Sequence, residues 1–176
     1  MEYKTQHTTE DRRAERVAFT GHRDFRGGDG GMLRTTIELL YKRGKQTFLS
    51  GMAVGFDLAA AEAVVAVRRA HPDIRLVAVV PFRGQQETYS LEDQYRFLEL
   101  TDAADQVVVL AEGYSREVYM VRNNYLIDHA STLVTWYDGH EGGTRYTVER
   151  ALKHRLRLLH LNPRTPIEVY PDPELF

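Results

Sequence analysis

Short apolar runs alternate with longer segments of helical spacing along most of the chain. The runs are rich in Val, Leu and Ile and lack a clean alternation of polar and apolar positions, which is typical of strands covered on both faces. Six runs have this character: residues 17–19, 47–49, 74–80, 107–110, 132–136 and 158–161. We therefore expect six strands in a mainly parallel sheet.

Apolar residues three and four positions apart mark one helix face in each of five segments between the runs. The segments are residues 32–42, 57–70, 91–100, 117–130 and 144–155. Asp57 is a suitable N-cap for the second of these helices. The alternation of strand and helix predicts an α/β sandwich with helices on both faces of the sheet.

The length of 176 residues favours one compact domain. Residues 1–16 are polar and without periodicity, and we interpret them as a mobile polar leader. The domain then spans residues 17–162. Residues 163–176 contain four of the six prolines, so we expect a proline-rich tail that is not helical.

Composition narrows the functions that this domain can perform. The absence of Cys excludes disulfides, thiolate nucleophiles and Cys-ligated metals. The seven His residues are scattered and no carboxylates have calcium-loop spacing, so no metal site is expected. A net charge of −2 argues against nucleic-acid binding through bulk charge. No apolar run is long enough for a membrane helix or a signal peptide, and we expect a cytoplasmic protein.

Ten of the 13 glycines fall into three groups, each following an apolar run. They are Gly21, Gly27, Gly28, Gly30 and Gly31, then Gly51 and Gly55, then Gly139, Gly142 and Gly143. Right-handed crossovers place the loops that follow parallel strands at one edge of the sheet, where ligands bind. A glycine lets a ligand approach the backbone, and a following helix offers unpaired N–H groups to a phosphate. Gly142-Gly143-Thr144 is the best candidate for a phosphate site.

Glycines also make ordinary tight turns in α/β folds, which is the alternative for any single loop. Three groups at one edge favour a ligand site instead. The chain carries neither the G-x-x-x-x-G-K-[ST] pattern of a P-loop nor the G-x-G-x-x-G pattern of a dinucleotide fold. The loops therefore indicate a phosphate-bearing ligand but do not identify it.

Several polar residues fall at the same predicted edge. Arg23 could clamp a phosphate or carboxylate, or form a surface ion pair. His22 could donate to a phosphate or be structural, and Asp57 could bind ribose hydroxyls or cap its helix. Arg122-Asn123 could hold a ligand or lie on a solvated helix face. Asp138 could bind a ligand hydroxyl or start an Asx turn.

Taken together, these motifs resemble one family. They are Thr20-Gly21-His22-Arg23, Ser50-Gly51-Met52-Ala53-Val54-Gly55-Phe56-Asp57, Arg122-Asn123, and Tyr137-Asp138-Gly139 with Gly142-Gly143-Thr144. In this order they are similar to the YpsA family of the SLOG superfamily, which groups the DNA-processing protein DprA with the "lonely guy" (LOG) phosphoribohydrolases. The resemblance implies a Rossmann-like three-layer fold, a nucleotide-type ligand and a homodimer.

The loops and the resemblance together select the candidate ligand-binding residues. These are Thr20, Gly21, His22, Arg23, Ser50, Gly51, Met52, Gly55, Asp57, Arg122, Asn123, Asp138, Gly139, Gly142, Gly143 and Thr144.

The LOG enzymes offer an enzymatic comparison. They carry P-G-G-x-G-T-x-x-E after a helix bearing Arg-Lys, and the Arg and Glu assist cleavage of an N-glycosidic bond. Arg122 matches that Arg, but Asn123 replaces the Lys and Thr147 replaces the Glu. Glu149 lies two residues further on, which rotates it by about 200° around the helix. A threonine cannot supply the carboxylate, which argues against LOG-type hydrolysis.

Three functions follow as hypotheses. The first is a sensor or regulatory module that binds a nucleotide or an ADP-ribose-like derivative, with no certain cofactor beyond that ligand. The second is a nucleotide N-glycosidic hydrolase that uses Glu149, Asp57, Asp138 or His22. The third is DprA-like binding of single-stranded DNA, which predicts a basic groove with stacking aromatics.

Overall fold

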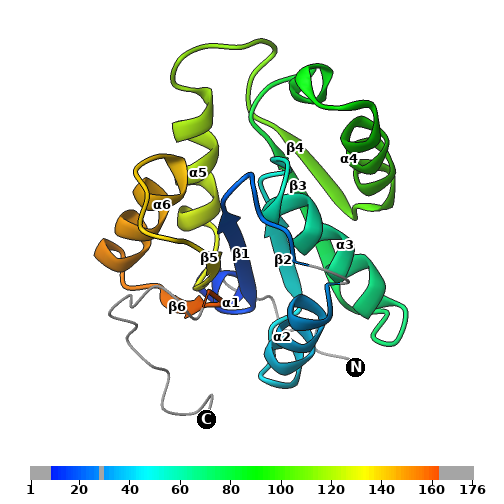
Figure 1. Ribbon diagram of the computed structural model, residues 1–176. Helices are drawn as coiled ribbons and strands as arrows, with labels where there is room; N and C mark the ends of the chain where they lie inside the picture. The colour runs from blue at the N-terminus through cyan, green and yellow to red at the C-terminus, as the bar shows by residue number, and fades with distance from the viewer. Residues whose placement is uncertain (1–8, 28–29, 163–176) are drawn as a thin grey trace.

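The computed structural model describes residues 9–27 and 30–162 and shows six parallel strands with helices on both faces (Figure 1). The strands are β1 (Arg16–Gly21), β2 (Thr47–Ser50), β3 (Arg75–Val80), β4 (Gln106–Val109), β5 (Thr132–Trp136) and β6 (Arg157–His160). The helices are α1 (Thr9–Ala14), α2 (Gly31–Lys42), α3 (Phe56–Arg68), α4 (Leu91–Ala103), α5 (Val118–Asp128) and α6 (Gly143–Lys153), with a 3-10 turn η1 at Gln85–Thr88.

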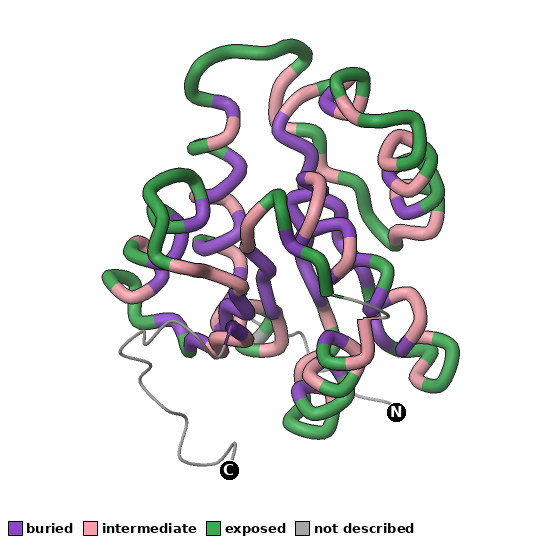
Figure 2. Tube along the Cα trace, viewed as in Figure 1, coloured by how far each residue is buried: buried purple, intermediate pink, exposed green. Residues whose placement is uncertain are grey.

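Two hydrophobic cores lie on opposite faces of the sheet. Helices α2, α3 and α4 cover one face, and α5 and α6 cover the other. Neighbouring strand residues contribute to different cores: Phe19 packs on the α2–α3 side and Ala18 on the α5–α6 side. Both are fully buried, as Figure 2 shows for most of the sheet. Because both faces of the inner strands are covered, those strands are apolar runs without alternation; the edge strand β4 is apolar but largely exposed.

The strand order is β4-β3-β2-β1-β5-β6. The chain moves outward from β1 through β2 and β3 to β4, and then returns so that β5 pairs with the other side of β1. The strand order therefore reverses between β1 and β5, where Gly21 is level with Trp136. In open parallel sheets the crevice outside the carboxyl ends of the strands at this reversal is the usual place for a ligand.

The predicted Rossmann-like three-layer fold with a parallel sheet is confirmed. One difference is the segment assigned to a mobile leader, part of which forms α1 and the start of β1. Helix α1 is tied to the body of the domain, because Arg13 Nε donates to Ala130 O at 3.0 Å and Ser131 Oγ donates to Ala14 O at 2.9 Å. A helix of six residues is too short to show periodicity. Residues 1–8 and the proline-rich tail at 163–176 lie outside the described residues.

Within the described ranges, none of the helices has the length and apolar character needed to cross a membrane.

Candidate functional site

A cavity of about 480 Å³ lies at the reversal of strand order. Its walls come from the loop after β1, the loop after β2, the first half of α5 and the N-terminus of α6. The lining residues are Thr20, Gly21, His22, Arg23, Asp24, Ala53, Asp57, Tyr119, Arg122, Asn123, Gly142, Gly143 and Thr144. Segments far apart in the sequence thus meet in one place.

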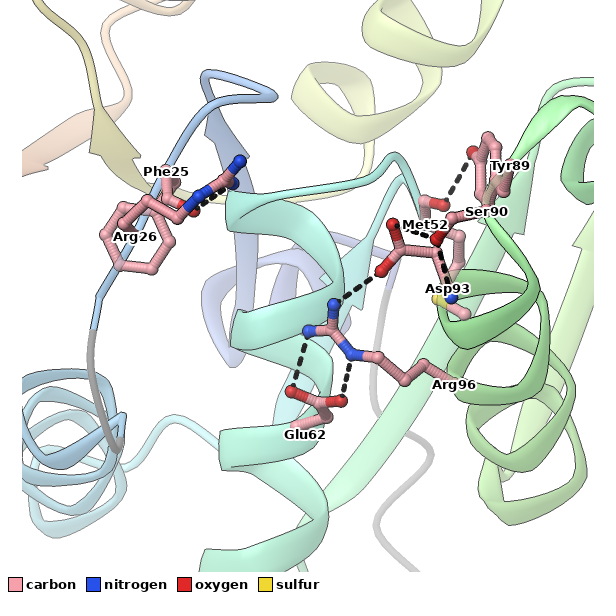
Figure 3. Close-up of polar contacts among 8 residues, drawn as sticks. All are labelled: Phe25, Arg26, Met52, Glu62, Tyr89, Ser90, Asp93 and Arg96. Atoms are coloured by element: carbon pink, nitrogen blue, oxygen red, sulfur yellow. Dashed lines mark hydrogen bonds and ion pairs between the residues drawn. The ribbon is translucent and has the colours of Figure 1, made fainter.

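The loop between β2 and α3 is held in one conformation by side chains. Ser50 Oγ donates to Asp57 O at 2.8 Å and accepts a hydrogen bond from Met52 N at 3.2 Å. Tyr89 Oη donates to Met52 O at 3.0 Å (Figure 3). Met52 has φ of 59°, a left-handed conformation that non-glycine residues seldom adopt. Such a conformation persists only where surrounding contacts enforce it, so this loop is a preorganised wall of the cavity.

Arg122 reaches from α5 to this loop across the cavity. Its Nη1 donates to Gly51 O at 2.5 Å, and its Nε donates to Asn123 Oδ1 at 2.8 Å. The same Nη1 lies 4.0 Å from Asp57 Oδ2. A Cβ atom at Gly51 would lie 2.6 Å from Nη1, so the glycine makes room for the guanidinium. Arg122 therefore fastens the β2–α3 loop to α5.

Asp57 is the second residue of α3, not its N-cap; that position belongs to Gly55. Its Oδ2 accepts a hydrogen bond from Ala53 N at 3.4 Å, while Oδ1 is buried without a hydrogen-bond partner among the described residues. Burial raises the pKa of Asp57 to about 6, although Arg122 and the Ala53 N–H act in the opposite direction. Burial also lowers the pKa of Arg122. The prediction that Asp57 caps its helix is wrong, because the close packing of the β1 and β2 loops places Gly55 at that position.

Two arginines share one aromatic ring at the cavity. The Cζ atoms of Arg23 and Arg122 each lie 5.8 Å from the ring centroid of Tyr119, within the range of a cation–π contact. Arg23 is exposed and makes no hydrogen bond or ion pair within the described part of the chain. Its guanidinium is therefore available to an anion that enters the cavity.

The N-terminus of α6 closes the opposite wall. Gly142 has φ of 141°, and the first helical turn begins at Gly143 and Thr144. The N–H groups of a first helical turn have no partner within the helix. Asn123 Nδ2 lies 3.5 Å from Gly143 O, a long hydrogen bond that joins α5 to this turn. The wall offers N–H donors and the positive end of the helix dipole to an anion.

The two positions compared with the LOG carboxylate do not contribute to the cavity. Thr147 is fully buried and its Oγ1 donates to Gly143 O at 2.7 Å. Glu149 is exposed and accepts a hydrogen bond from Arg145 Nε at 2.8 Å. Among the carboxylates considered as acid or base, Asp57 is the one that lines the cavity.

His22 and Asp138 form a pair beside the cavity. His22 Nε2 lies 2.6 Å from Asp138 Oδ1 and 3.1 Å from Asp138 N. Asp138 Oδ1 also accepts from His140 N at 3.0 Å, which is the Asx turn that the sequence offered as an alternative. This backbone N–H and the His140 ring lower the pKa of Asp138, and the carboxylate raises the pKa of His140. Asp138 thus positions His22 without lining the cavity itself.

The structure separates the candidate residues into two groups. The cavity is lined by Thr20, Gly21, His22, Arg23, Asp57, Arg122, Asn123, Gly142, Gly143 and Thr144. The others surround it: Ser50, Gly51 and Met52 hold the β2–α3 loop, Gly55 caps α3, Asp138 pairs with His22, and Gly139 has φ of 94° in the loop after β5. The alternative of a solvated face for Arg122-Asn123 is wrong, because both side chains are buried.

Sequence reasoning missed Tyr119, Ala53 and Asp24, which also line the cavity. Tyr119 is three residues before Arg122 on a segment predicted to be helical, and this spacing puts both on one face. This helical spacing was sufficient to place Tyr119 beside Arg122. Ala53 and Asp24 have no comparable signal, because a loop has no periodicity. No cluster of His, Asp and Glu able to hold a metal occurs within residues 9–27 and 30–162.

Comparison with known families identifies the family to which most of this domain belongs. The YpsA family model, described as the YspA SLOG family, matches residues 31–161. The chain belongs to the YpsA family. Among the relatives of this YpsA-family chain, the uncharacterised SPbeta prophage-derived protein YoqJ of Bacillus subtilis is 30% identical over 145 residues, which cover 73% of this chain and 85% of YoqJ. A UPF0398 protein of Halalkalibacterium halodurans is 28% identical over 122 residues, covering 68% of this chain and 65% of that protein.

Solved structures resemble the YpsA-family fold at low sequence identity. DNA processing protein A from Helicobacter pylori, described for its single-stranded DNA binding mode, has a TM-score of 0.64 at 19% identity and covers 92% of this chain and 70% of that one. DNA processing protein A (DprA) from Streptococcus pneumoniae has a TM-score of 0.58 at 17% identity. The match covers 88% of this chain and 52% of the DprA chain. At such identities the likeness shows the fold alone.

Proposed function

We propose that this protein binds a nucleotide or nucleotide-derived ligand in the 480 Å³ cavity and acts as a sensor or regulatory module. One observation carries the proposal: the first turn of α6, Arg23 and Arg122 line the same cavity at the reversal of strand order. The N-terminus of α6 and the exposed Arg23 guanidinium present positive charge to an anion there, whereas the charge of Arg122 is balanced by Asp57, 4.0 Å away. The cavity volume lies within the range of about 300–1,000 Å³ that is usual for small-molecule sites.

Each wall suits a different part of such a ligand. The first turn of α6, with Gly143 and Thr144, receives the phosphate, and Arg23 adds a bidentate donor. The Asp57 carboxylate lines the cavity, and its Oδ1 has no hydrogen-bond partner among the described residues; a hydrogen bond from a sugar hydroxyl would compensate the burial of this oxygen. The Tyr119 ring provides a face on which a base stacks.

Binding is favoured over N-glycosidic hydrolysis by the residues around the α6 turn. The carboxylate that LOG enzymes use is absent, because Thr147 is buried against the Gly143 carbonyl and Glu149 pairs with Arg145 on the surface. Of the four acid or base candidates, Asp57 and His22 line the cavity, so the experiment measures binding and product formation together.

The test uses purified protein with a panel of nucleotides and ADP-ribose. Calorimetry and thermal shift report binding, and chromatography reports the release of free base. We expect saturable binding of at least one nucleotide without turnover. Free base formed in proportion to the protein would establish the hydrolase instead, and the absence of binding to every nucleotide would overturn both functions.

Gly143 offers a sharp variant for this test. A Cβ atom there meets nothing closer than Asn123 Nδ2 at 3.5 Å, so a side chain is tolerated. We expect Gly143→Asp to weaken nucleotide binding at least tenfold through repulsion of the phosphate, and the isosteric Gly143→Asn to weaken it much less. Equal affinities of the two variants would place the phosphate elsewhere.

Binding of single-stranded DNA is a second candidate, favoured by a cluster of aromatic rings beside the cavity. Phe82, Tyr114 and Tyr119 have ring centroids 5.7–6.3 Å apart, and Tyr114 is 66% exposed. Aromatic rings next to arginines form the stacking platforms of single-strand binders. We expect fluorescence anisotropy with a short oligonucleotide to show binding weaker than that of the best nucleotide. Tight, salt-dependent binding that Tyr114→Ala removes would make DNA the principal ligand.

A further inference from the structure

Helix α4, which packs on α3 at the outer side of the molecule, carries apolar residues on two opposite sides (Figure 1). Phe97 and Leu100 are buried in the core that α3 shares. Leu91, Tyr95 and Leu98 are 73%, 69% and 51% exposed. Their spacing of four and three residues places these three within about 60° of one another around the helix, roughly opposite the buried pair. The outer stripe therefore points away from the core of the domain.

This outer stripe differs from the other apolar side chains that the described helices expose. Exposed leucines are ordinary when they occur singly, whereas a group of them marks an interaction surface. The large apolar side chains exposed on α2, α5 and α6 are between 37% and 45% exposed. Those of the stripe are more exposed and follow one helix face over about two turns. Packing within the domain does not account for them, whereas contact with another molecule does.

Helix α4 is fixed to α3 at its middle and at its C-terminal end. Arg96 Nε and Nη2 donate to the two carboxylate oxygens of Glu62 on α3 at 2.6 and 2.9 Å, and Nη1 donates to Asp93 Oδ1 at 2.7 Å (Figure 3). Near the end of the helix, Arg68 Nη2 donates to Ala103 O at 2.8 Å. The outer face of α4 is therefore held in place before a partner binds, which lowers the entropy cost of docking.

The charges beside the stripe determine which partner fits it. Helix α4 contains four carboxylates and one arginine, Arg96, which the contacts above engage. Glu92, Glu99 and Asp102 are exposed and form no ion pair with any residue in the ranges 9–27 and 30–162. Helix geometry places Glu92 and Glu99 along one flank of the stripe and Asp102 in line with it. Arg69 borders the groove beside Glu99 but belongs to α3, so the excess of negative charge lies on α4 itself. Such a surface attracts basic groups and repels the phosphates of nucleic acids and acidic lipids.

A second copy of this chain fits the stripe poorly. In an antiparallel pair of α4 helices related by a two-fold axis, the same flank of each helix faces the other, which brings the Glu92 and Glu99 flanks together. In a parallel pair, Asp102 would meet its own counterpart. Like charges oppose both arrangements, whereas a helix with basic flanks is attracted in either direction.

We propose that the outer face of α4 is a docking surface for a basic amphipathic helix of a protein partner. The apolar side chains of that helix, three and four residues apart, pack against Leu91, Tyr95 and Leu98. Its Lys or Arg residues lie beside Glu92 and Glu99. This role goes beyond nucleotide binding and does not depend on it.

The test uses the full chain and two synthetic helix-forming peptides, with fluorescence anisotropy as the readout. Both peptides carry leucines at positions i, i+4 and i+7. One has lysines along its flanks, and the other has glutamates at the same positions. We expect the lysine peptide to bind at least about tenfold more tightly than the glutamate peptide, and this difference to shrink as the salt concentration rises.

Variants of exposed residues locate the binding surface. Leu98→Ser should weaken binding of the lysine peptide at least about fivefold, because it removes the middle of the apolar contact. Leu39→Ser, which removes an exposed leucine from α2, is the matched control and should leave the affinity unchanged. The double variant Glu92→Gln and Glu99→Gln should reduce the salt dependence, whereas Glu38→Gln on α2 should not.

Several results would overturn this inference. They are the absence of saturable binding of the lysine peptide, equal affinities for the two peptides, and binding that Leu98→Ser leaves unchanged. Sedimentation velocity tests the other occupant: a wild-type dimer that Leu98→Ser converts to a monomer would assign this face to a second copy instead. None of these outcomes bears on nucleotide binding in the candidate cavity, so the two proposals fail separately.

Discussion

The Asp57 carboxylate lies 4.0 Å from the Arg122 guanidinium, and both side chains are more than nine-tenths buried. One comes from the start of α3 and the other from the middle of α5, on opposite faces of the sheet. The pair therefore joins the two helical layers at the carboxyl ends of the strands. Its neighbours are the loops that line the candidate site, so this contact links the stability of the domain to the shape of the cavity.

Arg122→Met should destabilise the protein strongly. It leaves Gly51 O without its donor and Asp57 without its counter-charge, and breaking a buried ion pair in this way costs about 3–5 kcal/mol. Urea denaturation at neutral pH measures the loss. The matched control is Arg145→Met, which removes an exposed, solvent-screened pair with Glu149 and should lower the free energy of unfolding far less than Arg122→Met does. Similar losses in the two variants would mean that Arg122 does not fasten the layers.

The raised pKa of Asp57 predicts a specific dependence of stability on pH. The carboxyl has a pKa of about 6 in the folded state and about 3.9 when unfolded, so between these values the folded state binds more protons. The free energy of unfolding therefore falls as pH rises from about 4 to about 6, by up to about 3 kcal/mol from this group. Asp57→Asn removes the titration. The stability of the wild type relative to this variant should decrease over that interval, and parallel curves would contradict the raised pKa.

Arg23→Met should separate binding from stability. Arg23 is exposed and has no hydrogen bond or ion pair within residues 9–27 and 30–162, so its loss should change the free energy of unfolding by less than about 0.5 kcal/mol. Nucleotide affinity should fall at least tenfold, because the exposed guanidinium is the group in the cavity that can donate hydrogen bonds to the phosphate. Calorimetry and urea denaturation on the same sample measure both effects. Unchanged affinity would remove Arg23 from the site.

Gly51→Ala should disturb the site through steric contact. The added Cβ would lie 2.6 Å from Arg122 Nη1 and 2.8 Å from its Cδ, so the guanidinium must leave the Gly51 carbonyl. Overpacking of this kind costs about 1–3 kcal/mol. Gly113→Ala is the control, because a Cβ atom there meets nothing within 4 Å. Denaturation midpoints that coincide for the two variants would show that Arg122 adapts without cost.

Local patterns were sufficient for the elements of the fold and for many of the residues that line the candidate cavity. The apolar runs located all six described strands. Burial on both faces explains this pattern for the inner strands, whereas the edge strand β4 is apolar but largely exposed. The glycine loops were placed at one sheet edge by the handedness of crossovers alone. The exceptions are short or irregular: α1 has six residues, and Ala53 and Asp24 lie in loops.

The sequence by itself determined the succession of strands and helices, the edge where the glycine loops gather, and the threonine at position 147 where LOG enzymes carry a carboxylate. Only the tertiary structure decided which polar side chains are buried together. The sequence alone allows Arg122 to lie on a solvated helix face. In the structure, α5 packs against the β2–α3 loop, and the buried Arg122 donates a hydrogen bond to Gly51 O. The tertiary structure likewise decided that Tyr119 lines the candidate cavity, and that Arg23 lies between this cavity and a larger one over α3. The physical reason is the range over which each interaction acts. Periodicity and capping depend on a few neighbouring residues, whereas these contacts depend on the strand order and on close approach between distant segments.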